Sequence, residues 1–288
     1  MFPRSLAHSL ISLISLISFI AIAPLTEAQI NREDDFNDGL DPLLWNTPVD
    51  VGEGTLQANL GTLGFSTGAP SSLAGSNHVS SLSSPGLVRA SNNWTANVTT
   101  FLGPLENFGT FDTFETVSLG LKVENSNDPN DSFSINFLAG LPFNVAGFGM
   151  GNFIRSLLTT DGMTSQQGVF DLLTNDADPS SLVEEVELQL SYNTFSGQVV
   201  SSYDAGEGFI PFALFDISDW NLNNAEDLTI SLEASALNTQ GTIQAPVNFS
   251  VPTGEAFFDD FRVTGAVPEP SSLTLLIFGV LSLFHRRR

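Results

Sequence analysis

The chain has 288 residues, of which 42% are hydrophobic and 24 are phenylalanine, so it can bury a large core and is not expected to be disordered. It carries 32 acidic side chains against nine basic ones, a net charge of −23, and it contains no cysteine. So acidic a surface repels phosphate groups, which argues against nucleic-acid binding. The absence of cysteine excludes disulfides, thiolate metal sites and cysteine nucleophiles.

The N-terminal segment 1–28 has the layout of a secretory signal peptide. Arg4 supplies a positive charge, and an apolar run punctuated by serines extends from residue 10 to residue 23. Thr26 and Ala28 then lie three residues and one residue before a plausible cleavage site. We therefore expect export, with an uncleaved membrane anchor as the alternative.

The C-terminal segment 267–288 combines a short motif, an apolar run and a basic cluster. The motif is Pro268, Glu269 and Pro270, and the cluster is Arg286, Arg287 and Arg288. Between them, a helix over the 12 residues 273–284 would span roughly 18 Å, less than the ~30 Å hydrocarbon core of a bilayer. The arginines would stay on the cytoplasmic side. These properties predict a stop-transfer segment that holds the chain in the membrane transiently.

This order of elements closely resembles the PEP-CTERM sorting signal. The resemblance implies export by a Gram-negative-type bacterium and processing near the motif by an exosortase-type membrane enzyme. It also implies a final place at the cell surface or in an extracellular polysaccharide matrix. A tail-anchored membrane protein is the alternative.

Between the two ends, segment 29–266 is dominated by apolar residues at every second position. The pattern occurs at Val117, Leu119, Leu121 and Val123, at Phe133, Ile135 and Phe137, and at Val186, Leu188, Leu190 and Tyr192. Half-buried antiparallel strands have this pattern. Residues 151–162 fit either a short helix or a strand. We therefore predict a single β-sandwich domain.

The edges of this domain add a second resemblance. It opens with "DDFNDGLDPLLWNTP" (34–48) and closes with "FFDDFRVTG" (257–265), and the segment 186–209 reads as a hairpin. These segments resemble the concanavalin A-like jelly-roll superfamily, in which the first and last strands lie together. The implied fold is an all-β antiparallel sandwich that hosts lectins as well as laminarinase-type enzymes.

One strand of the domain bears on catalysis. Laminarinase-type enzymes of this fold carry Glu-x-Asp-x-x-Glu on one strand, and Glu185 and Glu187 match the first two positions. The third position is Leu190, so the general acid/base that glycoside hydrolysis needs is missing. We predict that the protein is not an enzyme. A divergent glycoside hydrolase or lyase that uses Glu185 and Glu187 is the alternative.

Acidic residues at both edges predict a structural calcium ion, since hard oxygen ligands suit Ca²⁺. The predicted ligands are Asp35 and Asn37 near the first strand and Asp259 and Asp260 in the last. Alternation places Asp259 on the face of its apolar neighbours Phe257 and Phe261, where an uncompensated carboxylate would be costly. A cation is one remedy, and backbone amides or a nearby arginine are others.

A carbohydrate site would need an exposed aromatic ring for stacking against a sugar. Trp45 and Trp94 fall in apolar or strand-like surroundings and are predicted to belong to the core. Trp220 lies between Asp219 and Asn221, a polar setting suited to hydroxyl groups, and these three residues are the predicted ligand site. The sequence thus predicts an exported, exosortase-processed surface or matrix protein with a non-catalytic, carbohydrate-binding sandwich. A purely structural adhesin is a further alternative.

Overall fold

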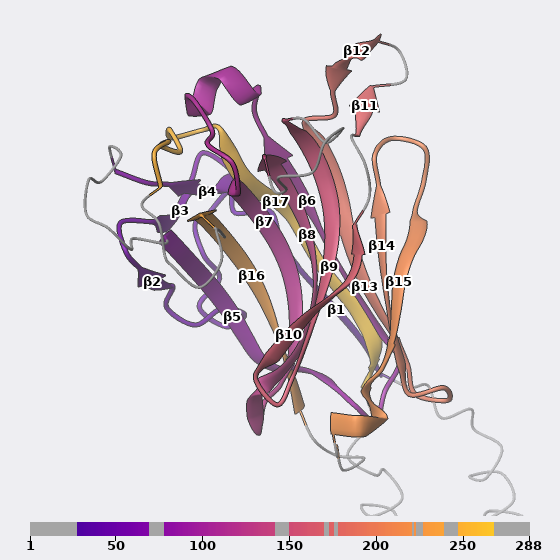
Figure 1. Cartoon of the computed structure of the whole chain (residues 1–288). Coiled ribbons are helices and arrows are strands. Elements are labelled where there is room, and N and C mark those ends of the chain that lie inside the picture. Colours follow the sequence, from indigo (N-terminus) through magenta and orange to yellow (C-terminus); the bar gives the residue numbers. More distant parts are fainter. Residues whose placement is uncertain are drawn as a thin grey trace, which may run out of the picture. The chain divides into compact units, whose positions relative to one another are not determined.

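A computed structural model describes residues 28–68, 78–141, 150–169, 173–175, 178–220, 222, 227–238 and 247–267. Over these residues the chain forms two antiparallel β-sheets stacked face to face, with two short 3-10 turns and no α-helix (Figure 1). The prediction of an all-β sandwich is confirmed. Residues 151–162, which the sequence left open between helix and strand, supply strand β9 (Gly151–Thr160).

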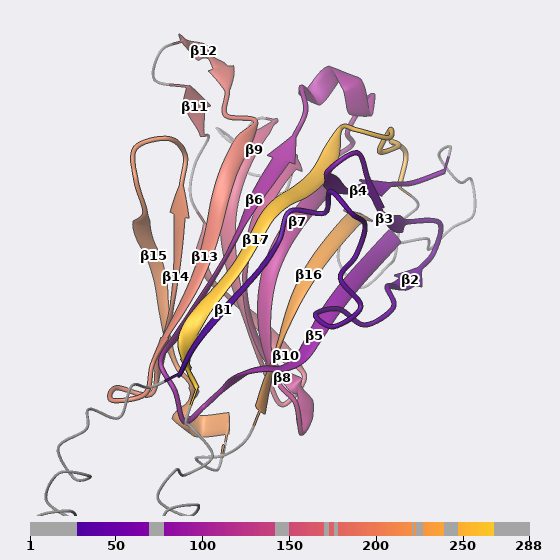
Figure 2. The same cartoon turned by 180° about the vertical axis from the view of Figure 1, so that it is seen from behind.

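The first sheet, called sheet A here, has eight strands and contains both ends of the domain. Its strand order is β15 (Ile210–Asp216), β14 (Gln198–Asp204), β13 (Glu185–Asn193), β6 (Trp94–Leu102), β17 (Ala256–Val267), β4 (Thr62–Ser66) and β3 (Thr55–Asn59), and β1 (Ala28–Asp34) pairs with β17. Figure 2 shows β1 running along β17. The first and last strands therefore lie together, as predicted.

The second sheet, sheet B, has seven strands from the middle of the chain. Its order is β10 (Met163–Val169), β9, β8 (Asp128–Gly140), β7 (Glu115–Asn125), β16 (Asp227–Asn238), β5 (His78–Arg89) and β2 (Val49–Val51). A separate two-stranded ribbon joins β11 (Thr174–Asn175) to β12 (Asp178–Leu182). The short 3-10 turns are η1 (Leu105–Phe108) and η2 (Ile217–Trp220).

The core lies between the two sheets, because every second side chain of each strand points inward. The predicted apolar positions of β7, β8 and β13 are at most 8% exposed. Trp45 and Trp94 are 5% and 3% exposed, so both belong to the core as predicted. Most of the alternate, outward positions carry polar side chains, so each sheet has one largely polar solvent-side face, with apolar exceptions such as Phe101 and Phe257.

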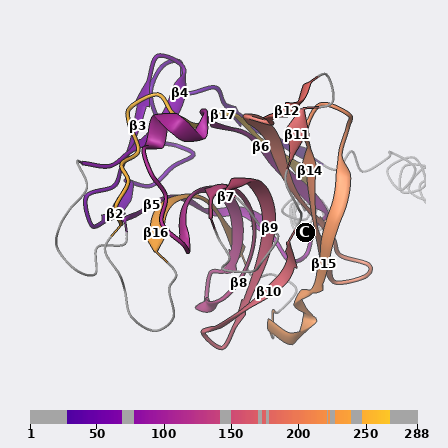
Figure 3. The same cartoon turned by 45° about the horizontal axis from the view of Figure 1, so that its top comes forward.

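The two solvent-side faces differ in curvature. Sheet B curls so that its outer face is concave, while sheet A wraps around the inner face of sheet B and presents a convex outer face (Figure 3). The concave face is formed by β7, β8, β9, β16 and β5. The convex face is crossed by β13, β6 and β17. Both faces therefore offer broad surfaces on rigid strands.

Residues 29–266 form a compact unit of their own. The predicted signal peptide and the sorting signal, including Pro268, Glu269, Pro270 and Arg286–Arg288, lie outside the described residues. Within the described part of the chain, the helices are too short to span a bilayer.

Candidate functional site

The acidic loop after β1 is organised by one buried carboxylate, that of Asp34. Its Oδ1 accepts a hydrogen bond from the backbone N–H of Phe36 at 2.8 Å. Its Oδ2 accepts from the indole Nε1 of Trp45 at 2.8 Å and from the backbone N–H of Asp41 at 3.2 Å. Asp34 is 7% exposed, so these bonds replace the water that it would otherwise bind. This carboxylate holds the loop together.

The four predicted calcium ligands come to neighbouring positions through the pairing of β1 with β17. Asp35 and Asp260 line one depression of about 660 Å³. The Asp35 carboxylate, however, accepts hydrogen bonds from the backbone N–H of Asn37 at 3.1 Å and from its Nδ2 at 2.8 Å. Nowhere in the described ranges do three acidic or histidine side chains converge on one point that suits a metal ion. Calcium binding by these residues stays a prediction.

A β-bulge in β17 changes which side chains share a face. The pairing with β6 shifts register between Asp259 and Arg262, and Asp260 takes a left-handed backbone conformation with φ of 48°. The extra residue turns Phe261 into the core, where it is fully buried, and leaves Asp259 on the convex face with Phe257. The prediction that Asp259 shares a face with Phe261 is therefore wrong.

Asp259 nevertheless lies in an unfavourable electrostatic setting. Burial raises the pKa of its carboxyl group, a hydrogen bond from the Asp260 N–H opposes that rise, and the carboxylates of Asp260, Asp35 and Glu185 add to it. A carboxyl whose pKa is higher in the folded state makes folding less favourable once it is ionised. The ionised Asp259 carboxylate therefore destabilises the fold at neutral pH, and this destabilisation disappears as the pH falls through the raised pKa and the group takes up a proton.

We expect Asp259→Asn to raise the free energy of unfolding at pH 7 by up to about 1 kcal/mol, the scale of partly exposed charge interactions. The gain should shrink as the pH falls towards ~3.9, where an ordinary aspartate becomes protonated. Urea titrations at several pH values measure it. The same gain at pH 3 and pH 7 would contradict the electrostatic explanation.

The predicted carbohydrate-stacking residue, Trp220, is not exposed. It ends the 3-10 turn η2, is 2% exposed, and its ring centroid lies 5.9 Å from that of Phe215. Its backbone carbonyl accepts a hydrogen bond from Nδ2 of Asn125 at 3.3 Å. Asp219 belongs to the same turn, and Asn221 lies outside the described residues. The prediction of an exposed ring is wrong, because the indole packs into the core despite its polar sequence neighbours.

Glu185 and Glu187 point outward from β13 onto the convex face. Glu187 accepts a hydrogen bond from Nδ2 of Asn97 at 2.8 Å. β13 pairs with β6 in unbroken register from Glu185 to Tyr192, so position 190 faces the opposite way, and Leu190 is fully buried. In this regular strand, positions 185, 187 and 190 do not converge on one face. The interpretation of Glu185 and Glu187 as solvent-facing strand carboxylates is confirmed.

The concave face of sheet B carries an ionic network that the sequence analysis missed. Nζ of Lys122, the only lysine of the chain, lies 3.0 Å from Oε2 of Glu124 and 3.3 Å from Oε2 of Glu233. These three side chains are 23%, 21% and 36% exposed, so they are partly shielded from water yet reachable from the concave side. Burial disfavours the charged lysine, but the two carboxylates outweigh it and raise the pKa of Lys122.

A row of in-register residues extends this network across the sheet. Glu233 pairs with Gly120 of β7, Gly120 with Asn136 of β8, and Asn136 with Arg155 of β9. A Cβ on Gly120 would collide with Oδ1 of Asn136, so a larger residue at position 120 would displace that amide. Nε of Arg155 is buried and has no hydrogen-bond partner. Burial lowers the pKa of Arg155, and the Glu233 carboxylate partly offsets the change.

Small polar residues surround these groups. Ser81, Ser134 and Ser231 occupy outward positions beside Glu233 and Lys122 in the paired register. The result is a concave polar surface on which two cations, two carboxylates and an amide are held by strand geometry. Rigid donors and acceptors in such a setting can bind a polyhydroxylated ligand.

Comparison with known proteins indicates the fold class. No family model matches the chain, and no curated protein does either. A winged bean acidic lectin complexed with methyl-alpha-D-galactose matches with a TM-score of 0.53 and 9% identity, over 84% of this chain and 100% of the lectin. The CBM2 module of the evolved Dit of Lactobacillus casei BL23 phage J-1 matches with a TM-score of 0.53 and 9% identity, over 85% and 99% of the two chains.

An enzyme has the same architecture. The catalytic domain of an endo-1,3-beta-glucanase (laminarinase) from Thermotoga petrophila RKU-1 matches with a TM-score of 0.50 and 11% identity, over 84% of this chain and 100% of that domain. At such identities the likeness concerns the fold alone. Together with the two antiparallel sheets, it shows that the chain has the concanavalin A-like jelly-roll fold.

Proposed function

We propose that this protein is an exported surface or matrix protein whose β-sandwich binds carbohydrate without cleaving it. The observation that carries the proposal is the concave-face network of Lys122, Glu124 and Glu233 with Asn136 and Arg155 beside it. Ion pairs fixed on strands present strong donors and acceptors at set positions, and hydroxyl groups of a sugar can bond to both kinds.

The charge of this network favours a neutral glycan. Two cationic and two anionic side chains cancel on the concave face, although the whole chain has a net charge of −23. A neutral polyhydroxylated ligand therefore approaches without needing a counterion, whereas an acidic polysaccharide is repelled by the rest of the molecule. A lectin among the proteins of similar fold is complexed with a neutral galactoside, which agrees with this choice.

The proposed absence of catalysis is supported by the sequence and register of β13. Glu185 and Glu187 lie on the convex face, and the third position of the laminarinase-type motif is Leu190, which the strand turns into the core. That position therefore supplies no general acid/base for glycoside hydrolysis. Release of reducing ends from a glycan by the purified domain, abolished by Glu185→Gln, would overturn this part of the proposal.

Export and sorting rest on the two ends of the sequence. An N-terminal signal peptide, the Pro268-Glu269-Pro270 motif, a short apolar run and three terminal arginines support export and processing by an exosortase-type enzyme. Mass spectrometry of the protein from its own cells should find the chain shortened at both ends. An intact C-terminal tail would refute exosortase processing.

The binding proposal is tested with a glycan array and the purified 29–266 domain. We expect binding to neutral glycans and, for Glu233→Gln, at least a tenfold loss of affinity at the concave face, because the substitution removes a carboxylate acceptor and one partner of Lys122. Glu106→Gln is the matched control, since Glu106 is exposed on η1 away from the concave face. If the two variants bound glycans equally well, the concave face would not be the binding site.

A further inference from the structure

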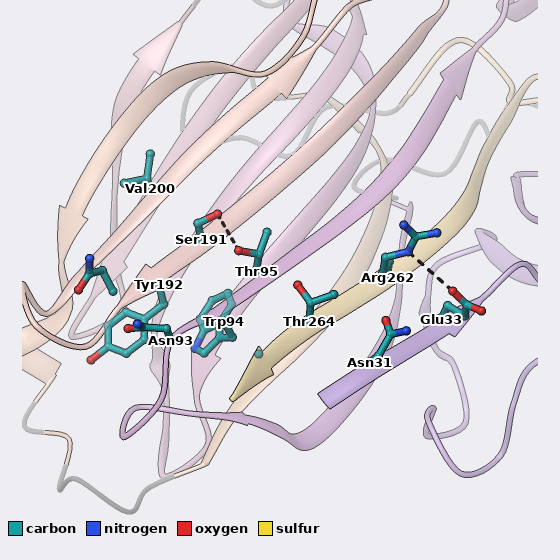
Figure 4. A pocket seen from close by; sticks show the side chains of 12 residues that line it. Asn31, Glu33, Asn93, Trp94, Thr95, Ser191, Tyr192, Val200, Arg262 and Thr264 are labelled. Carbon is teal, nitrogen blue, oxygen red and sulfur yellow. Dashed lines mark hydrogen bonds and ion pairs between the residues drawn. The ribbon is translucent and has the colours of Figure 1, made fainter. Parts of the chain in front are cut away.

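The convex face of sheet A holds a trough at the end where β17 leaves the sheet. The trough has a volume of about 1020 Å³ and is shown in Figure 4. Its floor is one cross-strand row in unbroken register, formed by Val200 of β14, Ser191 of β13, Thr95 of β6 and Thr264 of β17. All four side chains are small, so the floor is level and accessible.

The chemistry of the floor suits a chain of hydroxyl-bearing units. Oγ1 of Thr95 lies 3.2 Å from Oγ of Ser191, so these two hydroxyls are hydrogen-bonded, and Thr264 adds a third hydroxyl on the next strand. Neighbouring strands are about 4.7–4.9 Å apart, which is comparable with the length that one sugar ring adds to an extended polysaccharide. A glycan lying across the strands could therefore place successive rings over successive strands.

One flank of the trough provides a further donor and acceptor. Nε of Arg262 lies 3.7 Å from Oε2 of Glu33, and the two side chains are 59% and 67% exposed. Such an exposed pair contributes little to stability, so it can rearrange to bind a ligand at little cost. Figure 4 shows both side chains at the edge of the floor, beside Thr264 and Asn31.

Trp94 and Tyr192 border the other end of the trough. Trp94 is 3% exposed, its ring stacks on Tyr192 with centroids 5.8 Å apart, and its Nε1 has no hydrogen-bond partner. Gly265 permits the close packing, since a Cβ there would lie 2.8 Å from the Asn93 carbonyl oxygen. The Trp94 indole faces the core on the opposite side of β6 from Thr95, so it fixes the end of the strand that carries the floor.

We infer that this trough is a second carbohydrate site, which makes the domain bivalent. The inference rests on the proposed function and extends it, because the trough and the ionic network lie on opposite faces of the sandwich. Two sites facing away from each other cannot engage one short glycan together. They join two chains, so the protein cross-links matrix polysaccharide. An acidic depression adjoins the trough and shares Glu33 and Arg262 with it. Because its carboxylates repel anionic sugars, the trough should prefer a neutral polysaccharide.

The experiment measures stoichiometry with a neutral β-glucan hexasaccharide by isothermal titration calorimetry on the 29–266 domain. The wild-type domain should bind two molecules, and both Glu233→Gln and the double variant Thr95→Val/Thr264→Val should bind one. Thr99→Val is the matched control, because Thr99 lies on the same strand and the same face, four residues beyond Thr95 and outside the trough. Valine keeps the shape of threonine and removes only the hydroxyl.

A further readout separates the possible outcomes. The wild type and Thr99→Val should make a long β-glucan turbid by cross-linking, and neither Glu233→Gln nor the double variant should. A stoichiometry of one that the double variant leaves unchanged would overturn the second site and leave the proposed function intact. No binding by the wild-type domain would overturn both.

Discussion

Replacing Asp34 with alanine is expected to lower the free energy of unfolding by about 3–5 kcal/mol. Three donors, the N–H groups of Phe36 and Asp41 and the indole of Trp45, would lose the buried carboxylate that they bond. Hydrogen bonds to a charged group contribute about 1.5–3 kcal/mol each, and unsatisfied buried donors add their desolvation penalty. Not all of this is lost, because water enters the loop in the variant. Urea unfolding of the 29–266 domain measures the difference.

Two variants serve as controls for this prediction. Asp38→Ala removes an exposed carboxylate from the same loop and should change stability by less than about 0.5 kcal/mol. Asp34→Asn retains one oxygen acceptor, so its free energy of unfolding should lie between those of the two alanine variants. If Asp34→Ala and Asp38→Ala proved equally stable, Asp34 would be no anchor and the acidic loop would owe its shape to other contacts.

Local patterns in the sequence were sufficient to predict the architecture. A side chain of a strand alternates between two faces, so apolar residues at every second position identify both the strand and the face that is buried. The predicted apolar faces of β7, β8 and β13 are all in the core. The resemblance of the two edges correctly indicated that β1 and β17 pair. These features depend on residues close together in the chain or on one known fold.

Predictions that needed an exact backbone path were less successful. One extra residue at Asp260 reverses the alternation after Asp259, and nothing in "FFDDFRVTG" specifies on which side of the bulge each aspartate falls. Trp220 has polar neighbours in the sequence, Asp219 before it and Asn221 after it. The direction of its ring is nevertheless set by the turn η2, which points the ring towards Phe215. When a tight turn orients a loop residue, its neighbours in the sequence do not indicate whether its side chain is buried or exposed.

The concave-face network was invisible in the sequence for a different reason. Lys122 and Glu233 are 111 positions apart and meet only because β7 and β16 are neighbours in sheet B. The sequence held one hint of this network. Lys122 and Glu124 alternate with apolar residues and so fall on the outward face of their strand, and Lys122 is the only lysine of the chain. Strand order, which no local pattern encodes, is what turns these separate residues into one surface.

Substituting Lys122 with methionine is expected to weaken both the fold and glycan binding. Methionine keeps the length of the side chain but leaves the carboxylates of Glu124 and Glu233 without their cation. Loss of one partner from a fully buried ion pair costs about 3–5 kcal/mol, and the partial exposure of this network reduces the expected loss to about 1–3 kcal/mol. The affinity of the concave face for a neutral glycan should fall at least tenfold, because the two carboxylates then repel each other and lose their fixed positions.

The pH dependence distinguishes this electrostatic effect from lost packing. The pKa of Lys122 is raised in the folded state, so its contribution to stability is complete below the unfolded value of ~10.4 and is lost as the pH rises through the folded pKa. The wild type should therefore exceed Lys122→Met in stability by a constant amount between pH 7 and pH 9, and by progressively less above pH ~10.4. The triple variant Lys122→Met/Glu124→Gln/Glu233→Gln should regain part of the stability, since it removes the unpaired charges, but not the binding. A stability difference that stays constant to pH ~11.5 would mean that Lys122 acts through its aliphatic stem and not through its charge.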